Sequence, residues 1–521
     1  PPRHLPRHAA RRHAARHVAR RTARHTAAGR GWWRSLALVV LAGLVLVPVV
    51  LVAMRPTSAG ALSARDRHGA GAAHLRRAKK HTGGTGVRSV VKTSDHVVGI
   101  TGFQVGYDYT QYSHLPAGAG GNPAAVASAE RLLRAMDTVQ NVALMGWGAG
   151  DPEPSPGTYA WTSLDDRVEV MGSTVPATQR MITLCTAPGW MKVGGKTQEW
   201  NMDDAVAAAD DENFAALAAK VAQRYDGTHR AANGTLLPKV DDFDVWNEMK
   251  GYWDSATDDW NAAGYTTMYN DVYRAIKAVR PDALVGGPYA PLGAETAQDA
   301  SGPSPVEGAF GVVDPRALDV VAYWLQHKAG AQFMSMDGGP AVTDETGFAS
   351  GQYFAAVAHW VRSLDPLVYP GAGTLPIVWA EFYPGLDATT GVATGEEAVA
   401  VDLASIIRAG TAGIDDMMIW EMEGTASGAS SSTGEGVWTD TAAAGGGKPT
   451  WLAVALEELH AAFPPGTRLY GSTVAGPVDV LTGGTRALLV SESPVAQTVV
   501  LDKVKVSLGP YGVVTATLRR R

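Results

Sequence analysis

The sequence predicts an α/β protein: a (β/α)8 (TIM) barrel, preceded by one N-terminal transmembrane helix and followed by a small C-terminal antiparallel β domain. Three observations support this: a 20-residue uncharged segment near the N-terminus, eight alternations of short apolar runs with helical periods, and β-type alternation after residue 464. Hydrophobic residues make up 45% of the 521 residues and charged residues 18%. This composition excludes a disordered or fibrous chain.

The N-terminal part has the pattern of a membrane anchor. Residues 1–34 form a basic tail with ten Arg and no acid, and residues 35–54 carry no charge. At about 1.5 Å per residue, the uncharged segment matches a hydrocarbon core of roughly 30 Å. Because the Arg-rich side should stay cytoplasmic, we expect a single-pass signal anchor in the cell membrane with the body of the chain extracellular. The alternative is a signal peptide cleaved near residues 58–61, which would make the protein secreted.

Charge is distributed unevenly along the chain. Residues 1–92 hold 19 Lys and Arg against a single acid, Asp66, whereas residues 93–521 hold 26 basic and 50 acidic residues. We interpret residues 55–92 as a flexible basic linker, and two alternatives stay open for it: contact with anionic lipid headgroups, or a simple solvated spacer. The acidic body argues against nucleic acid as a partner.

The chain has one cysteine. A lone Cys185 excludes an intramolecular disulfide and a Cys-rich metal site, and its position inside an apolar run indicates a buried, inert thiol. We expect neither a metal nor another cofactor.

Residues 93–464 show the alternation of a barrel. The eight expected strands are Val98–Val105, Val142–Gly146, Met181–Thr186, Phe243–Trp246, Ala283–Gly287, Leu318–Tyr323, Ile377–Ala380 and Met417–Trp420. Between them lie amphipathic helical periods, for example the shared face of Tyr265, Met268, Val272 and Ile276. Apolar strands that alternate with helices predict a parallel sheet covered by helices, most simply a closed (β/α)8 barrel.

Two further segments complete the organisation. Residues 424–449, between the last strand and the last expected helix at Trp451–His460, are rich in Gly, Ser and Ala. A mobile lid and an unstructured loop are both compatible with this composition. Residues 465–521 show short β-type alternation broken by Gly and Pro, which predicts a β-sandwich-like domain.

Two expected strands end in a carboxylate within a similar frame. Strand four ends with the segment Asp244-Val-Trp-Asn-Glu248, and strand seven ends with Ile377-Val-Trp-Ala-Glu381. In such barrels the reacting groups lie at the carboxyl ends of the strands, and these two positions face each other across the barrel mouth. Cleavage of a glycosidic bond requires such a pair, one as proton donor and one as nucleophile, about 5–5.5 Å apart if configuration is retained.

At this point the sequence resembles a known family. Trp246-Asn247-Glu248, paired with a Glu that ends strand seven, is similar to the clan of retaining glycoside hydrolases with (β/α)8 barrels, and within it to glycoside hydrolase family 39 and its relatives. Residues 106–113 resemble the strand-one segment of that family, and residues 147–161 resemble its strand-two exit. The resemblance covers roughly residues 97–521.

The resemblance implies roles for single residues. Glu248 would be the general acid/base, and Glu381 would be the nucleophile. Asn247 would hydrogen-bond the sugar 2-hydroxyl, and Trp420 would form the floor of the sugar pocket. Glu248 would need a proton near neutral pH, and we expect the ionised Glu381 to supply the necessary rise in its pKa.

Other candidate substrate-binding residues are aromatic. Relatives often carry a His-rich end of strand six and an aromatic residue that orients the nucleophile; here the chain has Tyr323 and His327, and either could take that role. Trp147 and Trp190 lie near expected strand ends, where flat rings stack on sugars.

These expectations together predict a retaining glycoside hydrolase that acts by double displacement on an extracellular or cell-envelope polysaccharide or oligosaccharide. Two alternatives stay open: a non-catalytic carbohydrate-binding or adhesion protein on a barrel scaffold, and a transglycosylase that uses the same two carboxylates.

Overall fold

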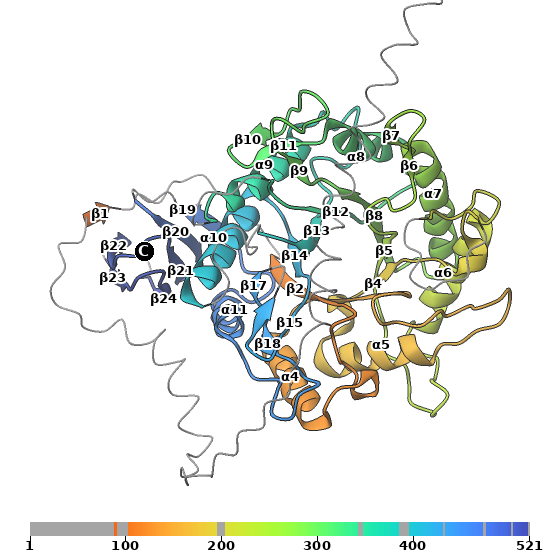
Figure 1. The fold of residues 1–521 in the computed structure, drawn as a ribbon, viewed down its shortest axis with the longest axis horizontal. Coiled ribbons are helices and arrows are strands. Elements are labelled where there is room, and N and C mark those ends of the chain that lie inside the picture. Colours follow the sequence, from red (N-terminus) through yellow and green to blue (C-terminus); the bar gives the residue numbers. More distant parts are fainter. Residues whose placement is uncertain are drawn as a thin grey trace, which may run out of the picture. The chain divides into compact units, whose positions relative to one another are not determined.

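A computed structural model gives the fold of the chain (Figure 1). It describes residues 88–90, 103–194, 204–341, 347–384, 395–430, 433–472, 476–501 and 504–518. All of these belong to one compact unit, residues 64–521. None of the helices within these ranges is both long and apolar enough to cross a bilayer, and the predicted span at residues 35–54 lies outside them.

Eight parallel strands close into a barrel in the order β12-β13-β14-β2-β3-β4-β5-β8. They are β2 (Gln104–Tyr109), β3 (Gln140–Ala143), β4 (Arg180–Leu184), β5 (Asp242–Val245), β8 (Leu284–Pro291), β12 (Phe333–Gly338), β13 (Ile377–Phe382) and β14 (Asp416–Ile419). The ring closes where β14 pairs with β2. The predicted (β/α)8 barrel is confirmed.

Each barrel strand leads into a helix on the outside, and these helices ring the strands in Figure 1. They are α4 (Pro123–Met136), α5 (Thr162–Thr174), α6 (Asp211–Arg224), α7 (Ala262–Val279), α8 (Pro315–His327), α9 (Ser350–Ser363), α10 (Glu396–Ala412) and α11 (Trp451–Ala462). Their apolar faces cover the strands and form the main core. A smaller cluster fills the inside of the barrel: Val139, Met181, Phe333, Val378 and Met418.

The expectation for strand six is wrong. Leu318–Tyr323 lies inside helix α8. This helix begins after Asp314, whose side chain accepts a hydrogen bond from the Arg316 amide, and Pro315 occupies the first helical position. The sixth barrel strand is instead β12, which begins at Phe333. The apolar residues of α8 bury one helical face against the barrel, so the run has a period of 3.6 rather than 2.

The other seven strands lie where the sequence predicts them, with shifted ends. The first begins later than expected, at Gln104 rather than Val98, and residues 98–102 fall outside the described ranges. The segment after β14 is folded where it is described, through four short strands: β15 (Glu423–Gly424), β16 (Ala429–Ser430), β17 (Gly434–Glu435) and β18 (Trp438–Thr439). Trp438 is fully buried and its ring contacts that of Tyr107 on β2. Packing of this kind contradicts an unstructured loop.

The C-terminal part forms antiparallel sheets, as predicted. One sheet has the order β19 (Leu469–Ser472), β20 (Val478–Gly483), β21 (Arg486–Ser491) and β24 (Val513–Thr517). A second contains the hairpin β22 (Gln497–Leu501) and β23 (Val504–Leu508), with β1 (Arg88–Val90) pairing parallel to β22. The β1 strand falls within the predicted linker. Arg408 of α10 joins the barrel to this part through ion pairs with Asp479 and Glu492.

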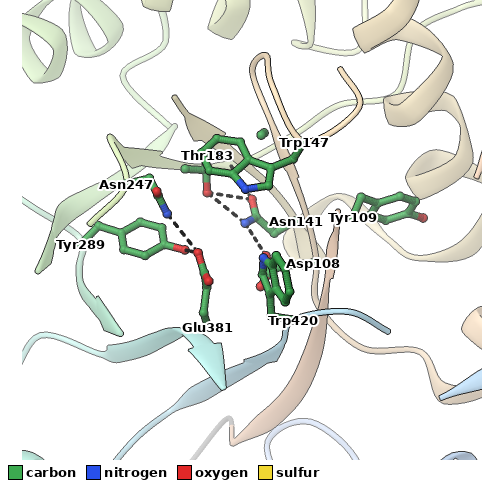
Figure 2. Close-up of a pocket in the computed structure, with 10 residues that line it drawn as sticks. Asp108, Tyr109, Asn141, Trp147, Thr183, Asn247, Tyr289, Glu381 and Trp420 are labelled. Atoms are coloured by element: carbon green, nitrogen blue, oxygen red, sulfur yellow. Dashed lines mark hydrogen bonds between the residues drawn. The ribbon is translucent and has the colours of Figure 1, made fainter. Parts of the chain in front are cut away.

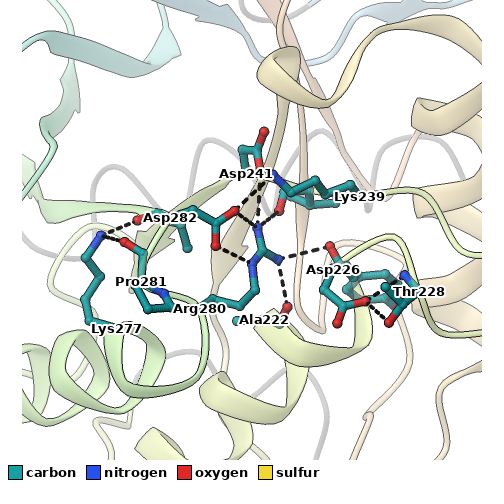
Figure 3. A network of polar contacts seen from close by, with 12 residues as sticks. Ala222, Asp226, Thr228, Lys239, Asp241, Lys277, Arg280, Pro281 and Asp282 are labelled. Atoms are coloured by element: carbon teal, nitrogen blue, oxygen red, sulfur yellow. Dashed lines mark hydrogen bonds and ion pairs between the residues drawn. The ribbon is translucent and has the colours of Figure 1, made fainter.

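An ionic network fixes the amino-terminal end of β5 (Figure 3). Arg280, at the end of α7, donates to the carbonyls of Ala222 and Val240 and to the carboxylates of Asp241 and Asp282. Its side chain is only 7% exposed. Arg280 also lowers the pKa of the Asp282 carboxyl through these hydrogen bonds. The network joins α6 and α7 to the amino-terminal end of β5, the strand that leads to Glu248.

Candidate active site

The turn that follows β5 carries Asn247 and Glu248 in an unusual backbone conformation. Trp246, Glu248 and Met249 have φ values of 75°, 46° and 51°. Side chains other than glycine disfavour this left-handed region by about 1 kcal/mol or more each. The fully buried Trp246 ring anchors the turn, because its Nε1 donates to the carbonyl of Lys250 at 2.9 Å. Strain of this kind is often held at functional sites.

Glu381 lies near the end of β13, where the ladder is irregular. The register of β13 shifts between Trp379 and Phe382 against β14, as a β-bulge does when it turns a side chain. The Glu381 side chain points to the barrel mouth (Figure 2), and the residue is 6% exposed.

Three donors hold the Glu381 carboxylate. Oε1 accepts from Asn247 Nδ2 at 3.0 Å and from the Tyr289 hydroxyl at 2.8 Å, and Oε2 accepts from the Tyr383 hydroxyl. Burial and the charge of Glu381 raise the pKa of both tyrosines, so that both hydroxyls keep their protons and donate. The three hydrogen bonds fix the orientation of the Glu381 carboxylate.

The ammonium group of Lys250 contacts both Asn247 and Glu248. Lys250 Nζ forms an ion pair with Glu248 and donates to Asn247 Oδ1 at 2.5 Å. With Oδ1 occupied, the Asn247 amide presents Nδ2 to Glu381. Lys250 also lies 5.8 Å from the centre of the Trp147 ring, and its side chain is 15% exposed.

A third carboxyl group lies beside the expected catalytic pair. One oxygen each of Glu248, Glu381 and Asp337, the last on β12, lie within 4.8 Å of one another. Two full negative charges at this separation repel by about 3.5 kcal/mol at an effective dielectric constant of 20. Burial raises the pKa of Asp337 well above its usual value, and the charge of Glu381 adds to the rise.

The pocket in front of Glu381 is small and mixed in character. It is lined by Asp108, Tyr109, Asn141, Ala143, Trp147, Thr183, Asn247, Tyr289, Glu381 and Trp420. Figure 2 shows a chain of polar contacts across it: Asn141 donates to Asp108 at 2.6 Å and to Thr183 at 2.9 Å. Trp147 and Trp420 add aromatic surface. Such a lining suits a sugar, which has both hydroxyls and apolar C–H faces.

The structure brings together some of the residues that the sequence singled out and separates others. Glu248, Glu381, Asn247, Trp147 and Trp420 meet at the barrel mouth.

Tyr323 and His327 do not lie at a strand end. Both are on α8, where their rings contact each other at 4.1 Å between centroids. The expected orientation of Glu381 by one of them is therefore wrong, and Tyr289 and Tyr383 hold the carboxylate instead. Trp190 belongs to the short helix η4 (Gly189–Met191), and its Nε1 donates to the Glu153 carbonyl at 2.8 Å.

Several residues of the site were missed from the sequence. Tyr289 stands two residues beyond an expected strand, and Tyr383 stands two residues beyond Glu381, so a search for aromatics after strand ends would have found both. Lys250 stands two residues after Glu248, but nothing in the sequence distinguishes it from a surface lysine. Asp337 was hidden because its strand was not predicted.

One group of His, Asp and Glu side chains lies outside the pocket lining and has the composition of a metal site. His114, Glu423 and Asp440 come within 4.8 Å of one another. Both oxygens of Glu423 already accept hydrogen bonds, from the backbone and ring of His114 and from Thr441. This group therefore ties the end of β2 to the segment after β14.

Comparisons with known proteins establish the fold. No family model and no curated protein matches the chain. Among solved structures, SrfJ from Salmonella typhimurium aligns with a TM-score of 0.54 and 10% identity over 85% of this chain and 94% of that one. The glycoside hydrolase family 30 subfamily 8 xylanase Xyn30A from Clostridium acetobutylicum aligns with a TM-score of 0.50 and 12% identity over 82% and 98%.

A family 39 β-xylosidase from Caulobacter crescentus is also similar, with a TM-score of 0.46 and 14% identity over 79% of this chain and 83% of that one. The resemblance to family 39 in particular stays a prediction. The chain has the barrel fold found in glycoside hydrolases.

Proposed function

We propose that this protein is a retaining glycoside hydrolase in which Glu381 is the nucleophile and Glu248 the general acid/base. The observation that carries the proposal is the approach of the two carboxylates, from β13 and from the turn after β5, to within 4.8 Å at the barrel mouth. Inverting enzymes separate their carboxyl groups by about 6.5–9.5 Å, to admit a water molecule, and retaining enzymes by about 5–5.5 Å. The short approach favours retention.

The different surroundings of the two carboxylates support these roles. Glu381 is buried and held by three donors, as suits an oriented anion, whereas the Glu248 side chain is 32% exposed and so can meet a leaving group and water. Glu381 attacks the anomeric carbon while the bond to the leaving oxygen breaks and that oxygen takes a proton from Glu248. Glu248 then removes a proton from water, which attacks the same carbon and frees Glu381.

Asn247 links substrate binding to the nucleophile. Its amide nitrogen donates to Glu381. A sugar 2-hydroxyl would compete for this amide, and the contact would strengthen as positive charge develops at the neighbouring anomeric carbon. Trp420 and Trp147 would stack on the sugar ring, and Asp108 and Asn141 would form hydrogen bonds with the sugar hydroxyls.

The test measures the stereochemistry of cleavage by the full chain. A panel of aryl glycosides is followed by NMR, which identifies the anomer released first. We expect retention, and loss of activity in Glu381→Ala and Glu248→Ala, with Glu307→Gln, an exposed carboxylate on β10 (Glu307–Gly308), as the control. Added azide should give a retained glycosyl azide with Glu248→Ala and an inverted one with Glu381→Ala. First release of the inverted anomer, or undiminished cleavage by Glu381→Ala, would refute the mechanism.

We also propose that the substrate is an extracellular or cell-envelope polysaccharide and that residues 35–54 anchor the protein in the cell membrane. The support is the uncharged segment between Arg34 and Arg55. Deletion of residues 1–54 should move the protein from the membrane fraction to the soluble fraction. Retention of the shortened chain by membranes would contradict the anchor.

A further inference from the structure

The third carboxyl group, Asp337, has no place in the mechanism just described. It is 1% exposed, and neither of its oxygens has a hydrogen-bond partner among the residues that the structure describes. An unpaired buried carboxylate is costly, so such a group keeps a proton or is held by a cation. Its closeness to Glu248 and Glu381 places it within the reacting centre.

The surroundings of Asp337 favour its protonated form. The charges that act on it are those of Glu381, Asp108 and Asp244, which oppose ionisation, and that of Lys250, which favours it; burial is the largest effect. The tyrosines that face it, Tyr289, Tyr353 and Tyr383, are neutral because burial raises the pKa of each.

Glu248 is in the opposite situation. Its carboxylate pairs with the Lys250 ammonium, and a neighbouring positive charge favours the ionised form. A general acid, however, must hold a proton before it can protonate the leaving oxygen. These contacts therefore favour the proton on Asp337, whereas the first chemical step needs it on Glu248.

We propose that Asp337 supplies the proton of Glu248 and that Lys250 moves between the two carboxylates, an inference that rests on the proposed function. In the resting state Asp337 is protonated and Lys250 pairs with Glu248. In the reactive state the proton has moved from Asp337 to Glu248, and the ammonium of Lys250 has moved to the Asp337 carboxylate. One proton changes place and the total charge is unchanged.

The proton and the ammonium group have only a short distance to move in this exchange. The carboxyl oxygens of Asp337 and Glu248 lie within 4.8 Å, close enough for one water or a small side-chain movement to join them. Lys250 acts electrostatically on Asp337 already, while it contacts Glu248. A sugar hydroxyl that takes the Asn247 amide would loosen the Lys250–Asn247 contact and so release the ammonium.

The test compares substrates that do and do not need a general acid. A dinitrophenyl glycoside has a leaving group that departs without protonation, whereas an alkyl glycoside of the same sugar requires it. In Asp337→Asn, which stays neutral but cannot give up a proton, we expect the ratio of kcat/KM for the two substrates, activated over alkyl, to rise by about 10²-fold. Asp402→Asn serves as the matched control, since this carboxyl of α10 is equally buried and does not act on Asp337, and the ratio should stay within about threefold of wild type.

A second change separates the proton exchange from a structural role. In Asp337→Asn with Lys250→Met, no ammonium holds Glu248 ionised, so Glu248 can take a proton from water. The ratio should return to that of Lys250→Met alone. An unchanged ratio in Asp337→Asn, or a ratio that stays high in the double variant, would overturn the exchange.

An infrared measurement locates the proton without any substrate. Other buried carboxyls also keep protons at neutral pH, for example Asp416, whose pKa is raised to about 8 by burial. The wild-type spectrum minus that of Asp337→Asn should therefore contain the carbonyl band of one protonated carboxyl; a difference spectrum without this band overturns the proposal. If the wild-type chain cleaves neither glycoside, the proposed function fails and the exchange fails with it. Cleavage of both by wild type, with the ratio unchanged in Asp337→Asn, overturns the exchange alone.

Discussion

The stability of the barrel should fall in mild acid because of one histidine. Both ring nitrogens of His460, on α11, are buried, and burial lowers the pKa of this side chain from 6.5 to about 4 despite the nearby Val105 carbonyl, which favours the protonated ring. The folded state therefore binds this proton less readily than the unfolded chain does. The contribution is fully present above pH 6.5 and is lost as the pH falls through 6.5 towards 4.

The size of the effect follows from the two pKa values. Relative to pH 7, the free energy of unfolding should decrease by about 2 kcal/mol at pH 5 and by about 3 kcal/mol at pH 4 through His460 alone. Domains of this kind are typically stable by about 5–15 kcal/mol, so the loss is readily measured. Other groups titrate in the same range; Asp416, for example, has its pKa raised to about 8 by burial and therefore acts in the opposite direction.

The assay isolates the histidine by difference. Urea unfolding of wild type and of His460→Gln is measured from pH 7 to pH 4.5, and the difference between their free energies of unfolding should shift by about 2 kcal/mol in favour of the variant by pH 5. His229→Gln, a change at a surface histidine whose side chain is 51% exposed, is the control and should follow wild type. A difference between wild type and His460→Gln that does not change with pH would show that the ring is not buried as a neutral group.

Two further predictions concern the site and its support. Tyr289→Phe removes a hydroxyl that donates to Glu381 at 2.8 Å, and since such bonds to charged groups contribute about 1.5–3 kcal/mol, kcat/KM should fall by about 10- to 100-fold, while Tyr323→Phe on α8 should leave it unchanged. Equal effects of the two changes would contradict the assignment of Tyr289. Arg280→Met should lower the free energy of unfolding in urea by about 3 kcal/mol, because it removes a nearly buried ionic centre. Arg274→Met, at a side chain that is 64% exposed, should change it little, and a similar loss in both would refute the argument.

Features of the fold could be predicted from the sequence where the pattern that marks them lies within a short segment of the chain. Seven of the barrel strands are short apolar runs with a helix after each, so their pattern is visible without any knowledge of distant residues. Glu248 and Glu381 end two of those runs, and the spacing of the runs was enough to place the carboxylates on opposite sides of the barrel. The structure brings them together as the sequence predicted.

Strand six was missed for a physical reason. β12 reads Phe-Met-Ser-Met-Asp-Gly, and it places Ser335 and Asp337, both almost fully buried, in a position that apolar residues fill in an ordinary strand. The helix before it, with its run Leu318–Tyr323, is the more hydrophobic of the two segments. The buried polar residues of β12 and the more apolar run just before it together hid the strand in the sequence.

The inside of the barrel contains both apolar residues, which pack, and buried carboxyl groups, which can take part in a reaction. An apolar cluster that includes Phe333 and Met418 fills part of it, and a buried acidic layer consists of Asp108, Asp244 and Asp337. Burial raises the pKa of each of these carboxyls, to about 7 for Asp244. Apolar residues of similar size would stabilise the fold more, since buried acids without full hydrogen bonding cost free energy. A barrel used only as a binding scaffold has no need for this cost, and titratable groups shifted in this way gather at catalytic centres. The acidic layer thus favours an enzyme over a non-catalytic carbohydrate-binding protein.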